Sequence, residues 1–158
     1  MKVLYVYEKI TSFGGVERIF VDKMNWLVNC SNINVFLLTY NQGIHQMPFI
    51  LDEKVICTDL NVMTFKAYQY HGFRRIWEKY KRTSILKCMI HDFITKLSPD
   101  IIITTTSGPV KYLLEAKGNA QLIIESHSGF NHIIESANDS FYFRCKYRLQ
   151  KKRIKEAD

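Results

Sequence analysis

The chain has 158 residues, of which 47% are hydrophobic and 13% aromatic, and its formal net charge is +7. This composition excludes a disordered chain, and the length indicates one domain, residues 1–158, with a sizeable hydrophobic core. No apolar run approaches the roughly 20 residues of a membrane-spanning helix, and the short N-terminal apolar run ends at Glu8, which is not typical of a signal peptide.

The positive charge is concentrated in two segments. Residues 66–87 contain seven basic residues and one acid, and residues 144–158 contain seven basic residues and two acids. These segments carry more positive charge than the whole chain, so the rest of the chain is acidic. Basic segments of this kind suit phosphates, nucleic acid or an anionic membrane.

The cysteines are widely scattered, and none forms a C-x-x-C pair or a Cys/His cluster with the spacing of zinc ligands. The four are Cys30, Cys57, Cys88 and Cys145. Because no export signal is visible, we expect four reduced thiols in a cytoplasmic protein, and no bound metal.

The first part of the chain predicts three strands and a helix. Residues 2–7 form an apolar run typical of a buried strand, and apolar residues at near-helical spacing predict a helix over 15–29. Residues 33–39 are rich in β-branched and aromatic residues, which favours a second strand. Pro48 indicates an irregular connection to a short third strand at 54–57.

The remainder of the chain predicts helices that alternate with strands. Two helices are expected, at 66–81 and 84–97, and the second ends where Ser98 precedes Pro99. The further elements are a strand at 101–105, a helix from Ser107 to about 116, a strand at 122–125 and a basic helix at 141–157.

This alternation predicts a Rossmann-like α/β fold, with a doubly wound, mostly parallel sheet as the middle of three layers. In such sheets, ligands bind at the carboxyl ends of the strands, near the point where the strand order reverses. Polar loops leave predicted strand ends at 11–15, 104–108 and 126–129. We expect these loops to converge on a ligand site.

Gly14 and Gly15 lie between the first predicted strand and the first predicted helix. Glycine allows backbone N–H groups to approach an anion, and the helix N-terminus adds a partial positive charge. A phosphate-bearing ligand is therefore the first hypothesis for this loop. The loop has neither the G-x-G-x-x-G nor the Gly-Lys-Ser/Thr pattern, and a simple tight turn is the alternative interpretation.

Several motifs occur in a characteristic order. They are Phe-Gly-Gly-Val-Glu-Arg at 13–18, Leu-Val at 27–28, Val-Phe-Leu-Leu-Thr at 35–39, Pro-Asp-Ile-Ile-Ile at 99–103 and Ile-Ile-Glu-Ser-His at 123–127. Together they resemble the start of the retaining glycosyltransferases of family four, which have the GT-B fold. The resemblance runs over nearly the whole chain, with gaps between Thr39 and Lys96. It implies the N-terminal, acceptor-side half of a GT-B enzyme, without the C-terminal donor-binding domain.

The resemblance implies a hexosyltransferase type of activity. The complete enzyme would move a sugar, with retention, from a nucleotide diphosphate sugar to a glycan or a lipid-linked glycan. No metal or other cofactor is implied, because phosphate charge would be met by basic side chains and helix N-termini. The donor is held mainly by the second domain of such enzymes, so residues 1–158 alone are expected to be inactive.

Site residues follow from the same resemblance. In the family, a histidine that follows the strand matching 122–125 faces the cleft between the domains and contacts the sugar. This resemblance makes His127 the expected catalytic residue. The other expected roles are donor diphosphate binding by Gly14, Gly15 and Arg18 and acceptor binding by Ser107 and Gly108.

Each of these side chains also has a structural interpretation. His127 could tie a loop in place, and Ser107 could cap the helix that follows it. Arg18 could form a surface ion pair with Glu17 or Asp22. Glu125, at the end of its strand, is expected to bond a neighbouring loop.

Aromatic residues at helical spacing mark the first basic segment. Tyr70, Phe73, Trp77 and Tyr80 alternate with the cations Arg74, Arg75, Lys79, Lys81 and Arg82. This pattern is typical of a basic amphipathic helix. Two interpretations are open: the rings pack on the domain's own sheet, or they contact an anionic membrane, which would place the protein at the inner face of that membrane.

Two other function classes compete with the transferase. A non-catalytic basic α/β module could bind a phosphate-bearing ligand or nucleic acid, although the aromatics and cations do not match a known RNA-binding motif. Another small α/β enzyme, such as a methyltransferase or a nucleotide-sugar epimerase, is disfavoured by the absence of a G-x-G pattern. On the leading hypothesis, nucleic acid is not a partner.

Overall fold

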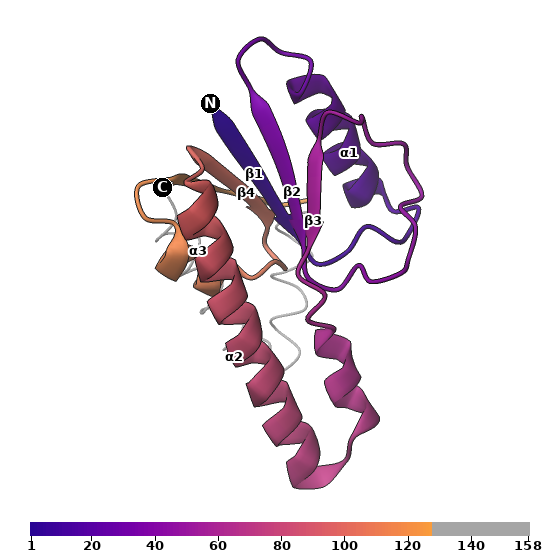
Figure 1. The fold of residues 1–158 in the computed structure, drawn as a ribbon. Helices are drawn as coiled ribbons and strands as arrows, with labels where there is room; N and C mark the ends of the chain where they lie inside the picture. Colours follow the sequence, from indigo (N-terminus) through magenta and orange to yellow (C-terminus); the bar gives the residue numbers. More distant parts are fainter. Residues whose placement is uncertain (128–158) are drawn as a thin grey trace, which may run out of the picture.

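Five strands form one all-parallel sheet in the computed structural model, which describes residues 1–127 (Figure 1). The strands are β1 (Lys2–Tyr7), β2 (Asn34–Thr39), β3 (Ile56–Asp59), β4 (Ile101–Thr105) and β5 (Gln121–Glu125), in the spatial order β3-β2-β1-β4-β5. Helices cover both faces of the sheet, so the predicted three-layer, Rossmann-like α/β fold is confirmed. The predicted helix at 141–157 lies outside the described residues.

Helix α1 (Gly15–Leu27) covers one face of the sheet. Val3 and Tyr5 of β1 point to this face, where they pack against Phe20, Val21 and Met24 of the helix. The ring of Phe20 lies edge-on to Tyr5, with the centroids 5.4 Å apart. Burial of these side chains fixes α1 directly behind the loop that carries Gly14 and Gly15.

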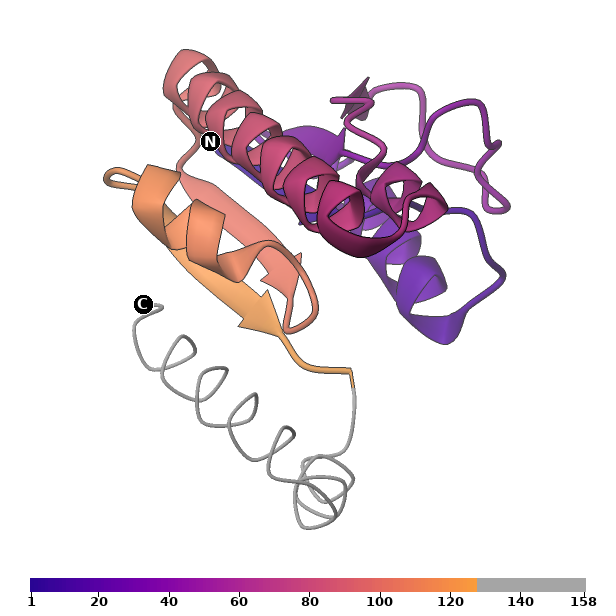
Figure 2. The ribbon, with the colours of Figure 1, turned by 90° about the horizontal axis from the view of Figure 1, so that it is seen from below.

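Helices α2 (Gly72–Leu97) and α3 (Val110–Ala116) cover the opposite face, as Figure 2 shows from below. Leu4 and Val6 of β1 point to this side, which follows from the alternation of side chains along a strand. The buried residues of α2 are Leu86, Ile90 and Ile94. All of them lie in the C-terminal part of the helix, so α2 contributes to the core through this part only.

The prediction of two separate helices at 66–81 and 84–97 is wrong. The structure has a short 3-10 helix, η1 (Thr64–Gln69), and then the continuous α2, which begins where Gly72 adopts a φ of +56°. No glycine or proline interrupts the chain after Gly72 within α2. The apolar stripe changes side along this helix, and the break in the pattern therefore does not mark a break in the backbone.

Other boundaries differ from prediction, and β2 and β5 each begin one residue away from the predicted start. β3 runs over Ile56–Asp59, because the amide of Val55 bonds the carbonyl of Asp52 in a turn that occupies the predicted strand start. Helix α3 begins at Val110, not at Ser107, and α1 ends at Leu27. By contrast, β1 and β4 have the predicted bounds.

Candidate functional site at the carboxyl edge of the sheet

The strand order reverses between β1 and β4, which are adjacent and parallel. The chain leaves β1 toward α1 on one face and leaves β4 toward α3 on the other, and such a divergence opens a crevice at the strand ends. The hydroxyl of Thr104 donates to the carbonyl of Val6 at 2.9 Å, and the amide of Thr106 donates to the carbonyl of Glu125 at 3.2 Å. These bonds tie the ends of β1, β4 and β5 together.

The glycine loop lies at the N-terminus of α1, with Gly14 in an extended conformation and no side-chain cap. The carboxylate of Glu17 folds back over the loop. Its Oε1 accepts from the hydroxyls of Ser12 at 3.0 Å and Tyr7 at 3.4 Å, and a Cβ added to Gly14 would collide with this carboxylate. A carboxylate in the first turn of a helix is favoured by the helix dipole. The protein's own carboxylate therefore lies where the sequence predicts a phosphate.

Gly15 has open space around it: a Cβ added there would meet no heavy atom within 4 Å. Packing therefore does not require a glycine at position 15. Arg18 is exposed, and its Nε lies 3.7 Å from a carboxylate oxygen of Asp22. The structure thus has Arg18 in the surface ion pair that was the alternative to phosphate binding. Exposed pairs of this kind contribute little stability, so the guanidinium is readily released.

Tyr7 connects the glycine loop to the sheet. Burial, and after it the negative charge of Glu17, raises the pKa of Tyr7 to about 12. The phenol therefore keeps its proton at neutral pH and donates a hydrogen bond to the Glu17 carboxylate. Sequence reasoning did not identify this pair, because a tyrosine at the end of a buried strand has no local pattern that distinguishes it from core.

His127 follows β5 and is largely buried. Its Nε2 lies 3.1 Å from Oε2 of Glu125, and the other oxygen of Glu125 accepts from Nζ of Lys23 at 2.8 Å. The side chain of Glu125 thus pairs with helix α1, whereas its backbone carbonyl accepts from the amide of Thr106 in the loop after β4, as expected. The contact between Nε2 and Oε2 lacks hydrogen-bond geometry, and neither buried atom has a hydrogen-bond partner among the described residues. Such orphaned buried atoms are uncommon, and a hydroxyl that contacts both would satisfy them.

Aromatic contacts join His127 to the glycine loop. The ring of Phe20 lies 5.7 Å from that of His127 and 5.1 Å from that of Tyr7, measured between centroids. A continuous path therefore runs from Glu17 through Tyr7 and Phe20 to His127. The loops after β1 and β4 and the start of the loop after β5 thus lie at one edge, as the sequence predicted, and residues 128 and 129 of the last loop lie outside the described residues.

Ser107 and Gly108 form a tight turn after β4. The hydroxyl of Ser107 lies 3.1 Å from that of Thr105, and Pro109 occupies the N-cap position of α3, so the prediction that Ser107 caps this helix is wrong. A Cβ added to Gly108 would collide with the Thr104 hydroxyl and would lie 3.1 Å from the Thr105 carbonyl oxygen. Gly108 is required by packing.

A cavity of about 240 Å³ lies at the same edge, on the side of α2 and α3. Its lining combines carboxylate, ammonium and hydroxyl groups with aromatic rings: Glu8, Thr64, Tyr68, Lys79, Gly108 and Tyr112 contribute to it. Oε1 of Glu8 accepts from Nδ2 of Asn41 at 2.9 Å, which fixes the carboxylate at the end of β1. Gly108 is the predicted acceptor residue that lines this cavity. Sequence reasoning missed the others, because they come from four separate segments of the chain.

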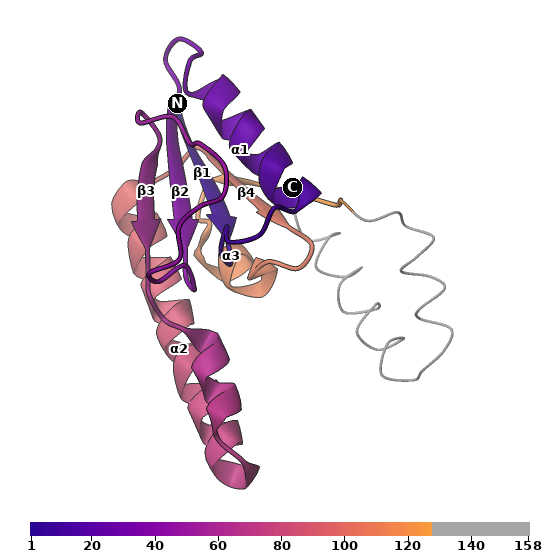
Figure 3. The same ribbon diagram turned by 90° about the vertical axis from the view of Figure 1, so that its right-hand side faces the viewer.

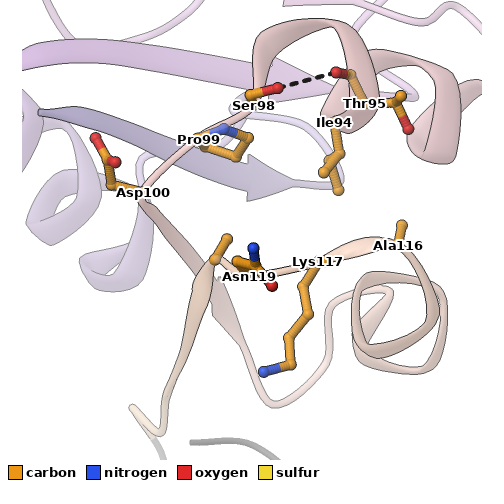
Figure 4. A pocket seen from close by; sticks show the side chains of 10 residues that line it. Ile94, Thr95, Ser98, Pro99, Asp100, Ala116, Lys117 and Asn119 are labelled. Carbon is orange, nitrogen blue, oxygen red and sulfur yellow. Dashed lines mark hydrogen bonds between the residues drawn. The ribbon is translucent and has the colours of Figure 1, made fainter.

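A second cavity, of about 500 Å³, lies at the opposite, amino edge of the sheet (Figure 4). Ser98 and Asp100 line one side, and Lys117 and Asn119 line the other. Helices α2 and α3 both end here, and the partial negative charge of their C-termini disfavours binding of a phosphate. The carboxyl edge is therefore the better candidate for an anionic ligand.

Within residues 1–127, no group of three His, Cys, Asp or Glu side chains is arranged to hold a metal ion. Cys30, Cys57 and Cys88 are free thiols, and Cys145 lies outside the described residues. None of the helices in this part of the chain is both long and apolar enough to span a bilayer.

Fold and edge together define a Rossmann-like α/β protein with a candidate ligand site at the strand-order reversal. Comparisons with protein-family models, with curated proteins and with solved structures found no match.

Proposed function

We propose that the chain is the acceptor-side domain of a retaining glycosyltransferase of the GT-B type. The complete enzyme moves a sugar from a nucleotide diphosphate sugar to a glycan or a lipid-linked glycan. The observation that carries the proposal is the contact path at the carboxyl edge, which joins the glycine loop to His127 through Tyr7 and Phe20. The motif order in the sequence supports the same function.

On this proposal, the donor diphosphate approaches Gly14 and Gly15 at the N-terminus of α1. The Glu17 carboxylate moves aside, and Arg18 leaves its exposed pair with Asp22 to contact a phosphate oxygen. Lys23 fixes Glu125 through Oε1, and a hydroxyl of the transferred sugar binds the two unsatisfied atoms, Nε2 of His127 and Oε2 of Glu125. His127 thereby orients the sugar at the reacting carbon.

The acceptor occupies the cavity beside Gly108. Glu8 and Lys79 offer an acceptor and a donor for sugar hydroxyls, and the rings of Tyr68 and Tyr112 offer flat apolar surfaces for a sugar ring. Acceptor and donor then approach one edge of the sheet from its two faces. This arrangement brings the acceptor hydroxyl toward the sugar carbon.

The proposal is tested with the protein produced from its complete coding region. The measurement is sugar transfer from a panel of nucleotide diphosphate sugars to glycan acceptors. We expect His127→Ala to lower kcat/KM about a hundredfold or more. His91→Ala is the matched control, because His91 is exposed on α2 and distant from this edge. No transfer to any glycan acceptor, or equal activity of the two variants, would overturn the proposal.

Gly15→Ala gives a second, sharper test. The added methyl group meets nothing in the protein, so any effect arises from a ligand that approaches the loop. We expect the affinity for the nucleotide diphosphate sugar to fall about tenfold, which corresponds to about 1.4 kcal/mol. Unchanged affinity in a correctly folded Gly15→Ala protein would remove the glycine loop from the donor site.

A further inference from the structure

A helical arm extends past the strand ends at the carboxyl edge of the sheet (Figures 1 and 3). We define the η1–α2 arm as residues 64–82, which comprise η1 and the N-terminal part of α2. The buried residues of α2 all come after the arm, at Leu86, Ile90 and Ile94. The arm therefore projects beyond the part of α2 that packs on the sheet.

The outer side of the arm carries a stripe of large apolar side chains. Phe73 is 91% exposed, Trp77 59% and Tyr80 73%, and Ile76 beside them is also exposed. These residues recur at helical spacing and therefore share one side of α2. Of the two interpretations that the sequence leaves open, packing of the aromatic residues on the domain's own sheet does not hold for Phe73, Trp77 and Tyr80.

A different side of the helix holds the arm together. The Arg75 guanidinium lies over the ring of Tyr68 in η1, 4.7 Å from its centroid, and Arg82 donates to the carbonyl of Val62 at 3.0 Å. Contacts with η1 and with the residues before it thus use side chains outside the aromatic stripe. Among the described residues, neither hydrophobic core cluster contains Phe73, Trp77 or Tyr80, so the core does not account for the apolar character of the stripe.

Positive charge surrounds the stripe. The arm contains six basic residues and one acid, Glu78, whose carboxylate lies 3.6 Å from Nε of Arg82. Lys66, Arg74, Arg75, Lys79 and Lys81 are all exposed. Lys81 also lies over the ring of Trp77, 5.3 Å from its centroid, so cation and aromatic surface are presented together.

We propose that the η1–α2 arm docks on an anionic lipid bilayer. Tryptophan and tyrosine are favoured at the level of lipid headgroups, where the ring is partly desolvated and its polar group stays wet. Exposed lysines and arginines beside such rings are attracted to anionic lipid phosphates. The arm lies on the bilayer with the aromatic stripe in the headgroup region.

Docking would also place the candidate acceptor cavity near the bilayer, because Tyr68 and Lys79 of the arm line that cavity. An acceptor on a lipid carrier would then reach the cavity from the membrane surface. This second step rests on the proposed transferase function, whereas the docking itself does not.

The two tryptophans of the chain allow a direct test, since Trp77 lies in the arm and Trp26 is an equally exposed residue of α1. Trp26→Phe leaves Trp77 as the reporter, and Trp77→Phe leaves Trp26. Each full-chain variant is titrated with vesicles of phosphatidylcholine, alone or mixed with phosphatidylglycerol. We expect a blue shift of Trp77 fluorescence with the mixed vesicles and no shift of Trp26.

Vesicle sedimentation then measures the contribution of charge. Arg74→Gln and Lys81→Gln should each lower binding to anionic vesicles about fivefold, and added salt should weaken binding further. Lys54→Gln, which removes an exposed cation outside the arm, serves as the control. Far-UV circular dichroism confirms folding of each variant.

Three results would overturn the proposal. The first is no shift of Trp77 with either vesicle. The second is a concentration-dependent shift of Trp77 without vesicles, which would indicate a second copy of the chain on the stripe. The third is salt-sensitive binding of single-stranded DNA by the arm with no binding to vesicles, which would assign the surface to nucleic acid.

Discussion

At the scale of single residues, the carboxylate of Glu17 determines how an anion can enter the glycine loop. It lies over Gly14, and the hydroxyls of Ser12 and Tyr7 hold it there. A diphosphate would have to displace a like charge from the N-terminus of α1. On the proposed function, Glu17 opposes diphosphate binding, and it stabilises the free protein because a carboxylate interacts favourably with this end of a helix.

Glu17→Gln removes this charge and keeps the shape of the side chain. We expect the affinity of the complete protein for a nucleoside diphosphate to rise about tenfold, because no like charge has to be displaced. The free energy of unfolding should fall by about 0.5 kcal/mol, since the favourable interaction with the helix dipole is weakened. Calorimetric titration and urea unfolding measure the two effects. Glu53→Gln, an exposed site in a turn, is the control, and weaker binding by Glu17→Gln would contradict the prediction.

The same substitution should lower the pKa of Tyr7, which burial and the charge of Glu17 raise to about 12 from 10.0. A raised pKa means that this phenol contributes stability below pH 10 that is lost as the pH rises toward 12. Alkaline titration of phenolate absorbance, taken as a difference from Tyr7→Phe, reports the midpoint. Burial keeps that midpoint above 10.0 in Glu17→Gln. An unchanged midpoint would show that the carboxylate has no influence on Tyr7.

The sequence predicts where the site residues lie better than it predicts their partners. His127 follows β5 as expected, because the order of strands and loops fixes its place. Its support by Lys23 and Glu125 was not predictable, since these residues are 102 positions apart and meet only after β5 joins the sheet. Serine is a common helix cap, but the hydroxyl of Ser107 bonds that of Thr105 in the turn before Pro109, and Pro109 occupies the N-cap position.

At the scale of elements, α2 shows how one helix can serve two environments. Its C-terminal part buries Leu86, Ile90 and Ile94 against the sheet, whereas its N-terminal part exposes Phe73 and Trp77 on another side. The sequence predicts helix for nearly all of this region and places a false boundary where the apolar stripe changes side. Hydrophobic periodicity reports which side is apolar, and it locates a helix end only when the pattern stays in phase.

The turn between β4 and α3 depends on a glycine for packing. Gly108→Ala should lower the free energy of unfolding by about 1–3 kcal/mol, because the new methyl group has no room beside Thr104 and the Thr105 carbonyl. Displacement of the Thr104 hydroxyl would also weaken its bond to the Val6 carbonyl. Urea unfolding measures the change. Gly15→Ala is the matched control, since it should leave stability unchanged or slightly raised. Equal stability of Gly108→Ala and the original chain would contradict this account.

At the scale of the whole molecule, the two faces of the sheet carry different parts of the proposed function. The α1 face holds the glycine loop, His127 and the residues that position it. The face of α2 and α3 holds the cavity at Gly108, and the η1–α2 arm extends from this side. A parallel sheet brings both to one edge, because all its strands end there. The alternation of strands and helices in the sequence predicts that the sheet has two covered faces, but it does not predict the cavity at Gly108.

This division predicts that the arm affects transfer only when the acceptor lies in a membrane. Trp77→Ser combined with Arg74→Gln should reduce transfer to a lipid-linked acceptor in anionic vesicles about tenfold, mainly through a higher apparent KM. With the same acceptor dissolved in detergent, the variant should match the original protein, because the arm substitutions leave the His127 side of the edge intact. Trp26→Ser combined with Lys54→Gln is the control in both assays. Equal loss in vesicles and in detergent would show that the arm shapes the acceptor cavity itself, and equal activity in vesicles would separate membrane docking from transfer.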